Sequence, residues 1–498
     1  MLNNKDYTSK GIISNTFFSI ASKVVPILIS LVCIPIIING LGEEKYGAFT
    51  VALVFIGYFN LFDLGLGRAI TKLISERIGK DKDQEIADIF KTGVTLTLVL
   101  GVVGGIIFYL VSEPITIKYL KPPKEFINEV IRGLTFLAIG IPFAIMINSY
   151  RGVLEALHEF KSITWVQIIL GASTYVGVIM LMEFTTDLAY IIAYLSGMKI
   201  IHFLTYRKIS NSKLETKLIQ QNFDKTYIKQ LFSFGGWITV STIVSPIMTA
   251  LDRLIVASKE GMESVAYYST ASEITQRVGV LPSALVSVLF PVFSRNQNFN
   301  DDQNSRIYKA SFNLMLLGSG VFAIGFICFG NDFLAIWISE GFANKSYFVL
   351  QIITVGALFN FLARIPFSFI QGVGRPDITA KFHIIELPVF LALLFVLTDR
   401  YGIIGAAFAS SIRMILDFIL LHIYAVLKFK VDHSLLPLIL GAVLPTIIGF
   451  YIASASLSIG AKSGYTILLS AGLTLIFWVF IFDDQLRKRI LNTLKMGK

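Results

Sequence analysis

The sequence predicts an all-α, polytopic membrane protein with about fourteen transmembrane helices. The 498 residues are 54% hydrophobic, their mean hydropathy is +0.70, and charged residues make up only 15%. A typical soluble domain carries about 25% charged residues. Apolar runs of roughly 20 residues, the length that spans a hydrocarbon core, also follow one another along nearly the whole chain.

The apolar runs give the expected spans in order. The first six lie at about residues 12–39, 46–68, 91–112, 128–150, 162–183 and 187–206. The next six lie at about 229–252, 264–291, 307–330, 347–371, 381–398 and 402–426, and the last two at about 434–455 and 462–482. The first run is longer than a signal-peptide core and has no obvious cleavage site, so we expect it to remain as an uncleaved span.

Lysine and arginine are divided unevenly between the two sets of connections. The segments on the side of the N-terminus hold 28 of them, and the segments on the opposite side hold nine. Cytoplasmic segments of membrane proteins collect basic residues. We therefore expect both termini in the cytoplasm, and the net charge of +10 does not require a nucleic-acid partner.

An internal repeat sets the expected domain organisation. Residues 42–49 match residues 261–268 at an offset of 219, and residues 151–153 match 371–373 at an offset of 220. Such a near-constant offset indicates a duplicated unit of about six spans. We expect an N-lobe of spans 1–6, a C-lobe of spans 7–12, and two accessory spans with a cytoplasmic tail, at residues 1–210, 211–428 and 429–498.

Charged side chains inside the apolar runs mark the candidate site. A charge at the centre of a membrane helix costs roughly 2.5–3.5 kcal/mol on insertion scales, so such residues persist where they face water or one another. The polar faces of spans 1, 2, 7 and 8 predict that these helices line a transport cavity. The candidate substrate-binding residues, with no catalytic or metal-binding residue expected, are Lys23, Asp63, Arg68, Asp252, Arg253, Glu273, Arg277 and Arg364.

Some of these charges also have a purely structural interpretation. Glu273 with Arg277, and Arg413 with Asp417, are spaced i, i+4, so each pair could form a local ion pair. Lys23 has no acidic neighbour of this kind and could pair with an acid on another helix. Three more charges, close to the predicted span ends and therefore set aside, are Arg132, Lys199 and Glu386.

Enzyme signatures do not occur in the sequence. Cys33 and Cys328 fit neither a disulfide framework nor a metal-ligand spacing, and the five histidines are scattered. No Gly-Lys-Ser/Thr loop that would cradle phosphates occurs. The predicted outside loops are all shorter than about 20 residues, which disfavours a membrane-embedded polymerase or transferase. We expect a protein that is not an enzyme and that needs no cofactor.

Short motifs stand in a fixed order along the chain. They are Leu41-Gly42 with Tyr46-Gly47, Asp63-Leu64-Gly65-Leu66-Gly67, Leu251-Asp252-Arg253, Leu289-Phe290-Pro291, Gln371-Gly372-Val373-Gly374-Arg375-Pro376 and Gly402-Ile403-Ile404-Gly405-Ala406-Ala407. In these motifs the chain resembles the polysaccharide-biosynthesis flippases. These are Wzx-type proteins of the multidrug/oligosaccharidyl-lipid/polysaccharide exporter superfamily.

The resemblance implies a fold and a function. The implied fold is two six-helix lobes in a V shape around a cationic cavity, with two further C-terminal helices. The implied function is a flippase that moves undecaprenyl-pyrophosphate-linked oligosaccharide repeat units across the bacterial inner membrane by alternating access, for O-antigen or other surface polysaccharide. A coupling ion, H⁺ or Na⁺, and the polysaccharide polymerase machinery are the partners to test.

The alternative is a cation-coupled multidrug exporter of the same fold. Such an exporter should favour acidic cavity residues, whereas the charges here are predominantly basic. We expect Lys23 and Arg277 to contact the pyrophosphate, because ammonium and guanidinium groups bind such anions well. We also expect Glu273→Gln to impair export more than Asp63→Asn, with no effect on drug sensitivity.

Overall fold

A computed structural model shows that the described residues form helices and their connections, with no strand among them. The description covers residues 9–481 except 60–62, 79, 81, 158, 215–222, 281, 284, 287–288, 290–292, 294–301, 430, 432–435 and 456–457. It also leaves out the side chains of residues 9–23, 58, 232–247, 249–250, 302–304, 436, 439 and 480. The chain divides into two compact units, residues 1–266 and 267–498. The lobe boundaries expected at 210 and 428 remain a prediction.

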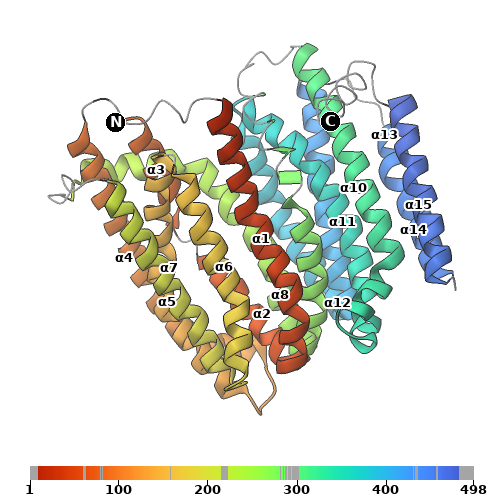
Figure 1. The fold of residues 1–498 in the computed structure, drawn as a ribbon, viewed down its shortest axis with the longest axis horizontal. Helices are drawn as coiled ribbons and strands as arrows, with labels where there is room; N and C mark the ends of the chain where they lie inside the picture. Colours follow the sequence, from red (N-terminus) through yellow and green to blue (C-terminus); the bar gives the residue numbers. More distant parts are fainter. Residues whose placement is uncertain are drawn as a thin grey trace. The chain divides into compact units, whose positions relative to one another are not determined.

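Unit 1 contains the first seven helices and most of the eighth. Their bounds are α1 Ser9–Leu41, α2 Glu43–Tyr58, α3 Leu66–Ser75, α4 Asp83–Ile115 with a π-helical turn at Thr116–Leu120, α5 Ile127–Ala156, α6 Phe160–Met182, α7 Leu188–Lys213 and α8 Thr226–Val278. Helix α5 packs against α3, α4 and α7, while α1 packs along α6 (Figure 1). Apart from the broken second span, these helices correspond to the spans expected from the apolar runs.

Glycine turns at equivalent places support the internal repeat. Gly42, before α2, has φ 80° and ψ 161°, and Gly261, inside α8, has φ 84° and ψ 177°. Glycine adopts a positive φ without the steric cost that a side chain would add. The turn at Gly261 divides α8 into the two helices expected as spans 7 and 8. A methyl group on Gly47 would lie 1.8 Å from the Met262 carbonyl oxygen, so these two motif segments are in contact.

Unit 2 holds the remaining helices. Their bounds are α10 Asp302–Trp337, α11 Glu340–Gly372, α12 Pro376–Phe429, α13 Leu436–Leu438, a π-helical turn at Ile439–Val443, α14 Leu444–Ser454, and α15 Ile459–Ile476 with a second π-helical turn at Phe477–Ile481. Gly402, with φ 59° and ψ −140°, divides α12 into the two helices expected as spans 11 and 12. Helix α10 contacts α11, α14 and α15.

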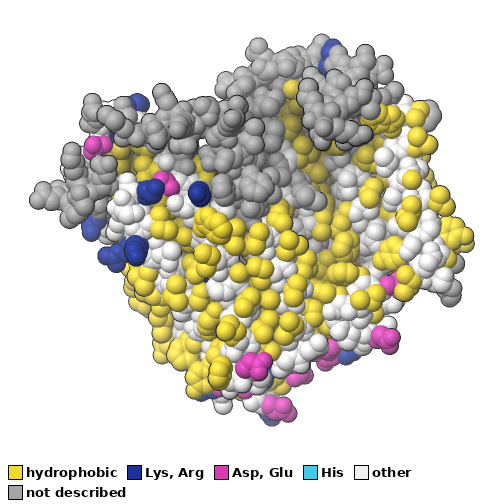
Figure 2. Space-filling model, in the orientation of Figure 1, with side chains coloured by type: hydrophobic (Ala, Val, Ile, Leu, Met, Phe, Trp, Pro, Cys, Tyr) yellow, Lys and Arg dark blue, Asp and Glu magenta, His cyan; other side chains and the backbone are white. Residues whose placement is uncertain are grey.

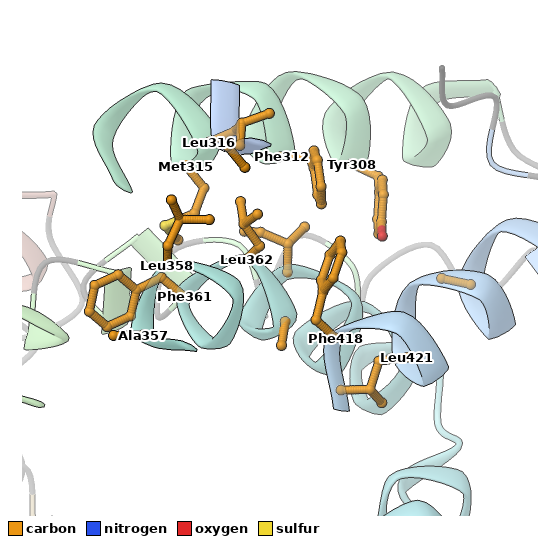
Figure 3. Close-up of a cluster of buried hydrophobic side chains, with 14 of the residues drawn as sticks. Tyr308, Phe312, Met315, Leu316, Ala357, Leu358, Phe361, Leu362, Phe418 and Leu421 are labelled. Atoms are coloured by element: carbon orange, nitrogen blue, oxygen red, sulfur yellow. The ribbon is translucent and has the colours of Figure 1, made fainter. Parts of the chain in front are cut away.

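The core of unit 2 is apolar and well packed. Figure 3 shows Tyr308 and Phe312 of α10 beside Leu358 and Leu362 of α11. Phe418 of α12 belongs to the same buried cluster. All five side chains are at most 3% exposed. Close packing of this kind fixes the neighbouring helices at a defined register, because a core tolerates few voids.

A similar serine-to-carbonyl contact beside a glycine is found in both units. In unit 1 the Ser196 hydroxyl of α7 donates a hydrogen bond of 2.8 Å to the Phe136 carbonyl of α5, beside Gly140. In unit 2 the Ser411 hydroxyl of α12 donates one of 2.8 Å to the Ile352 carbonyl of α11, beside Gly356. Small residues let membrane helices approach closely, and hydroxyl groups then bond across the interface. This shared contact relates α7 to the second half of α12.

The outer faces are those of a multi-pass membrane protein. Nine helices among the described residues are long and apolar enough to cross a membrane. In Figure 2, hydrophobic side chains are spread over the middle of the described surface, and the described acidic side chains gather mainly near its lower edge. Large apolar side chains such as Leu110 of α4, Ile385 of α12 and Leu468 of α15 are more than 60% exposed. Such exposure suits contact with lipid.

Candidate functional site

The predicted site residues fall in both units. Asp63, Arg68, Asp252 and Arg253 belong to unit 1, and Glu273, Arg277 and Arg364 belong to unit 2. Lys23 lies in α1, but its side chain is outside the described residues. Each local group is therefore considered by itself, and the lining of one cavity by all eight residues remains a prediction.

The second predicted span is broken, which corrects the expectation of one helix over residues 46–68. Helix α2 ends at Tyr58 and α3 begins at Leu66. Between them Leu64 and Gly65 adopt φ values of 50° and 76°, a left-handed conformation that ends a helix. The hydropathy of the run gives no signal for this break. Gly65 and Gly67 of the Asp63–Gly67 motif were the available signal.

Asp63 occupies this break and holds it together. Its carboxylate accepts a hydrogen bond of 2.8 Å from the Gly65 N–H, and it also accepts from the Gly67 backbone and the Asn148 side chain. Aspartate commonly binds backbone N–H groups in this way where a helix begins. Arg68 lies exposed in the first turn of α3, near enough to act electrostatically on Asp63.

Asp252 and Arg253 are buried in the first part of α8. Their exposed fractions are 4% and 6%. The backbone N–H of Arg253 donates a hydrogen bond of 2.7 Å to the Asp252 carboxylate. This bond partly satisfies the buried carboxylate, which alone would be costly in a membrane.

Glu273 and Arg277 form the predicted i, i+4 ion pair. Arg277 Nη2 lies 3.0 Å from Glu273 Oε2, and the two side chains are 15% and 14% exposed. Directly beside this pair, one residue earlier in each turn, the Gln276 amide donates a hydrogen bond of 2.9 Å to the Ser272 hydroxyl. This stretch of α8 thus carries a polar face on a membrane helix, with its strongest charges already neutralising each other.

Arg364 reaches from α11 to the end of α8. Its guanidinium donates hydrogen bonds to the Gly279 carbonyl, at 3.3 Å, and to the Ser283 hydroxyl. Carbonyl groups at the end of a helix have no partner within it and carry partial negative charge. A cation here stabilises the end of α8, which gives Arg364 a structural function beside the predicted one.

Glu386, set aside above as a residue near the end of its span, lies among other charged residues. Glu386 was expected about five residues into its span, but α12 begins at Pro376 and Glu386 is 4% exposed. His383 Nε2, on the same half of α12, lies 3.6 Å from Asp417 Oδ1 on the other half. One imidazole nitrogen of His383 and one carboxylate oxygen each of Glu386 and Asp417 all lie within 4.8 Å of one another. The i, i+3 spacing of His383 and Glu386 was the available signal.

Arg132, also set aside, has a simple explanation. Its guanidinium lies 2.8 Å from the Asp187 carboxylate, and its side chain is 55% exposed. Asp187 is the N-cap of α7 and accepts a hydrogen bond of 2.7 Å from the Ala189 N–H. This exposed pair stabilises a helix start and carries no sign of a substrate site.

Comparison with known sequences gives a consistent result. Residues 12–297 match the family model described as polysaccharide biosynthesis protein. A candidate O-antigen transporter of Shigella flexneri is 32% identical over 413 residues, which cover 83% of this chain and 97% of that protein. The match therefore extends over nearly the whole relative.

Comparison with solved structures identifies the fold. The lipid II flippase MurJ in an inward closed conformation superposes with a TM-score of 0.72 at 18% identity, over 93% of this chain and 98% of that one. An inward-facing multidrug resistance transporter of the MATE family, in the MOP superfamily, gives 0.69 at 14% identity, over 83% and 98%. At these identities the likeness shows the fold of the chain alone.

Proposed function

The chain belongs to the polysaccharide biosynthesis protein family, and on that premise we propose that it is a flippase for lipid-linked oligosaccharides. The observation that carries this proposal is the 32% identity to a candidate O-antigen transporter over 97% of that protein. The fold shared with a lipid II flippase agrees with a lipid-linked cargo. The relatives compared are described as transporters and not as enzymes.

The finer proposal concerns the cargo and its path. The substrate would be an undecaprenyl-pyrophosphate-linked repeat unit, moved by alternating access from the cytoplasmic to the outer face of a bacterial inner membrane. The excess of Lys and Arg in the segments on the side of the N-terminus supports cytoplasmic termini. The product would then pass to the polysaccharide polymerase machinery.

Positive charge in the membrane helices supports an anionic headgroup. We assign Lys23 and Arg277 to the pyrophosphate, because an ammonium and a guanidinium offer charge-assisted hydrogen bonds to its oxygens. Glu273 holds Arg277 by its ion pair of 3.0 Å. A guanidinium has five donors, so this pairing leaves Arg277 able to donate further hydrogen bonds to a ligand.

The second candidate is a multidrug exporter, favoured by the likeness to the MATE fold. That likeness is at 14% identity, whereas the polysaccharide relative is at 32%. Buried acids such as Asp252 could bind cationic drugs. The described Asp63 and Glu273 carboxylates, however, already accept hydrogen bonds from protein groups.

Complementation separates the two functions. The chain should restore surface polysaccharide in a flippase-deficient strain that makes the cognate repeat unit, and should leave drug tolerance unchanged. Lys23→Ala or Arg277→Ala should reduce that polysaccharide about tenfold or more, with the protein level in the membrane measured in parallel. Glu273→Gln should reduce it more than Asp63→Asn. Asparagine keeps an oxygen that accepts from the neutral Gly65 N–H, whereas glutamine loses the charge that pairs with the Arg277 guanidinium.

Two results would count against this assignment. Drug tolerance without polysaccharide, in a strain that makes the repeat unit, would refute the flippase. Normal polysaccharide from both Lys23→Ala and Arg277→Ala would refute the headgroup site while leaving the flippase intact.

A further inference from the structure

Four ionisable side chains gather inside the helical hairpin of α12. His383 and Glu386 come from its first half, and Arg413 and Asp417 from its second. Their exposed fractions are 5%, 4%, 6% and 7%. Potential ligand atoms of His383, Glu386 and Asp417 all lie within 4.8 Å of one another. We call these four residues the α12 cluster.

The α12 cluster is short of hydrogen bonds. Both carboxylate oxygens of Glu386 and Oδ1 of Asp417 have no hydrogen-bond partner among the described residues. The same holds for His383 Nδ1 and Arg413 Nε. Buried polar groups are normally satisfied, and those that are not require an explanation such as a ligand or a functional role. Here the carboxylates converge, so the explanation is a ligand that brings positive charge.

Among the described residues, we find no such charge on the neighbouring helices. Helix α11 places the Phe367 ring 6.0 Å from the His383 ring, and its Arg364 is directed to Gly279 and Ser283. The charged groups that act on Glu386 are Asp417 and Arg413, both within the α12 cluster. The Arg413 guanidinium lies 5.4 Å from the Phe390 ring centroid.

Two described tyrosines that reach the second half of α12 from other helices are already engaged. The Tyr268 hydroxyl of α8 lies 2.9 Å from the Ser410 hydroxyl. The Tyr308 hydroxyl of α10 lies 2.9 Å from His422 Nδ1. Neither contact supplies a donor to the carboxylates of Glu386 and Asp417.

The formal charges of the four residues limit the charge of the ligand. With both carboxylates ionised, Arg413 charged and His383 neutral, the α12 cluster has a formal charge of −1. One added H⁺ or Na⁺ makes it neutral, whereas a divalent metal ion would make it +1 and stand close to an arginine. Net charge is costly in a low-dielectric interior, so the neutral combination is favoured. The His383 imidazole beside Asp417 favours the proton, because a hard metal cation prefers oxygen ligands and an imidazole accepts protons readily.

We infer that the α12 cluster binds and releases one proton, with Glu386 as the principal acceptor and the Asp417–His383 pair sharing the proton. This inference rests on the proposed function for its purpose, which is to couple flipping to a proton gradient. No bond other than O–H or N–H forms or breaks, and the proton exchanges with water on one side of the membrane at a time.

The position of the α12 cluster connects proton binding to helix packing. The two halves of α12 meet at the Gly402 turn, and a methyl group on Gly405 would lie 1.9 Å from the Leu397 carbonyl oxygen. The two halves are therefore closely packed at the turn. Further from the turn, His383 of the first half faces Asp417 of the second. A proton changes the attraction between them, and a ligand shifts a conformational equilibrium only through such a difference between states.

Unit 1 lacks the equivalent acid. Ser196 of α7 corresponds to Ser411 of α12 by their shared contact with a carbonyl on the preceding helix. Two and six residues further on, α12 has Arg413 and Asp417, whereas α7 has Met198 and His202. The α12 cluster is thus a feature of unit 2 and not a remnant common to both repeats.

Infrared difference spectroscopy tests the site without any substrate. The full chain in lipid nanodiscs is titrated with acid, and the carbonyl stretch of a protonated carboxylic acid is followed. Exposed acids also titrate, so the test compares variants. We expect one band of the wild-type spectrum to be absent from Glu386→Gln and present in Glu273→Gln, which removes an acid that is already paired. Asp417→Asn should weaken proton binding about tenfold or more, because it removes the neighbouring negative charge.

A second variant guards against misfolding. Glu386→Asp keeps a carboxyl group, so its band should shift in frequency rather than vanish. In the complementation strain we expect Glu386→Gln to export at least tenfold less polysaccharide at equal protein level, and Glu386→Asp to recover part of it.

The outcomes distinguish this inference from the proposed function. A band that persists unchanged in Glu386→Gln overturns the proton site. So does a tightly bound metal ion, found by elemental analysis of the wild type and lost in Glu386→Gln. Titration of Glu386 without polysaccharide export by the wild type supports the proton site and refutes the flippase. Polysaccharide export without titration of Glu386 supports the flippase and refutes the proton site.

Discussion

Two charged pairs in unit 2 have the same spacing and opposite outcomes. Glu273 and Arg277 of α8 form an ion pair of 3.0 Å. Arg413 and Asp417 of α12, also four residues apart, form none in the described structure. Asp417 faces His383 at 3.6 Å instead, and Arg413 lies over the Phe390 ring. The spacing of opposite charges therefore does not by itself decide whether they pair.

The order of the charges contributes to the difference, together with the alternative partner that the buried Asp417 finds in His383. Order alone does not decide, because Arg151 and Glu155 of α5 have the arginine-first order and still pair at 2.8 Å where the arginine is 42% exposed. Side chains on a helix lean toward its N-terminus. A long arginine at i+4 therefore reaches back to an acid at i, as Arg277 does to Glu273. An arginine at i leans away from an acid at i+4, as Arg413 does from Asp417. The acid-first order is also the better one in isolated helices.

The first prediction breaks the pair that forms. Arg277→Ala should destabilise the protein by about 3 kcal/mol, because it leaves a buried carboxylate without its cationic partner. The double variant Glu273→Gln/Arg277→Met should be less destabilised, since it removes both charges. Unfolding of the purified protein in mixed detergent micelles measures both. Equal destabilisation of the single and double variants would show that the pair is not the cause.

The second prediction reverses the order of the pair. Glu273→Arg/Arg277→Glu keeps both charges but gives them the order of Arg413 and Asp417. We expect stability to fall by roughly 1 kcal/mol, more than the 0.2–0.5 kcal/mol of an exposed helix pair, because these side chains are mostly buried. The same unfolding assay measures it. Wild-type stability in this variant would contradict the explanation from side-chain direction.

The third prediction sets the scale with an exposed pair. Arg132→Ala removes the ion pair of 2.8 Å to Asp187, whose arginine is 55% exposed. Water and salt screen such a pair, so the loss should be about 0.5 kcal/mol or less. The Asp187 cap on α7 remains in this variant. A loss as large as that of Arg277→Ala would show that burial does not explain the difference between the pairs.

Much of the fold could be predicted from the sequence because its signals are local. A run of apolar residues long enough to cross a bilayer must satisfy its backbone as a helix. Turn glycines such as Gly42 and Gly261 mark where one helix ends and the next begins. The break at Asp63 was missed because its cause, a left-handed Leu64 beside Gly65, hardly changes the hydropathy of the run.

The sequence by itself determined the membrane class, the order of the helices and the repeat, since each depends on residues near one another in the chain. Only the tertiary structure decided which charges meet. Glu386 looked like an interfacial residue until the turn at Gly402 brought its half of α12 against Asp417 and Arg413. Contacts between helices depend on register and rotation, which are fixed by packing across the interface and not by the periodicity of either helix.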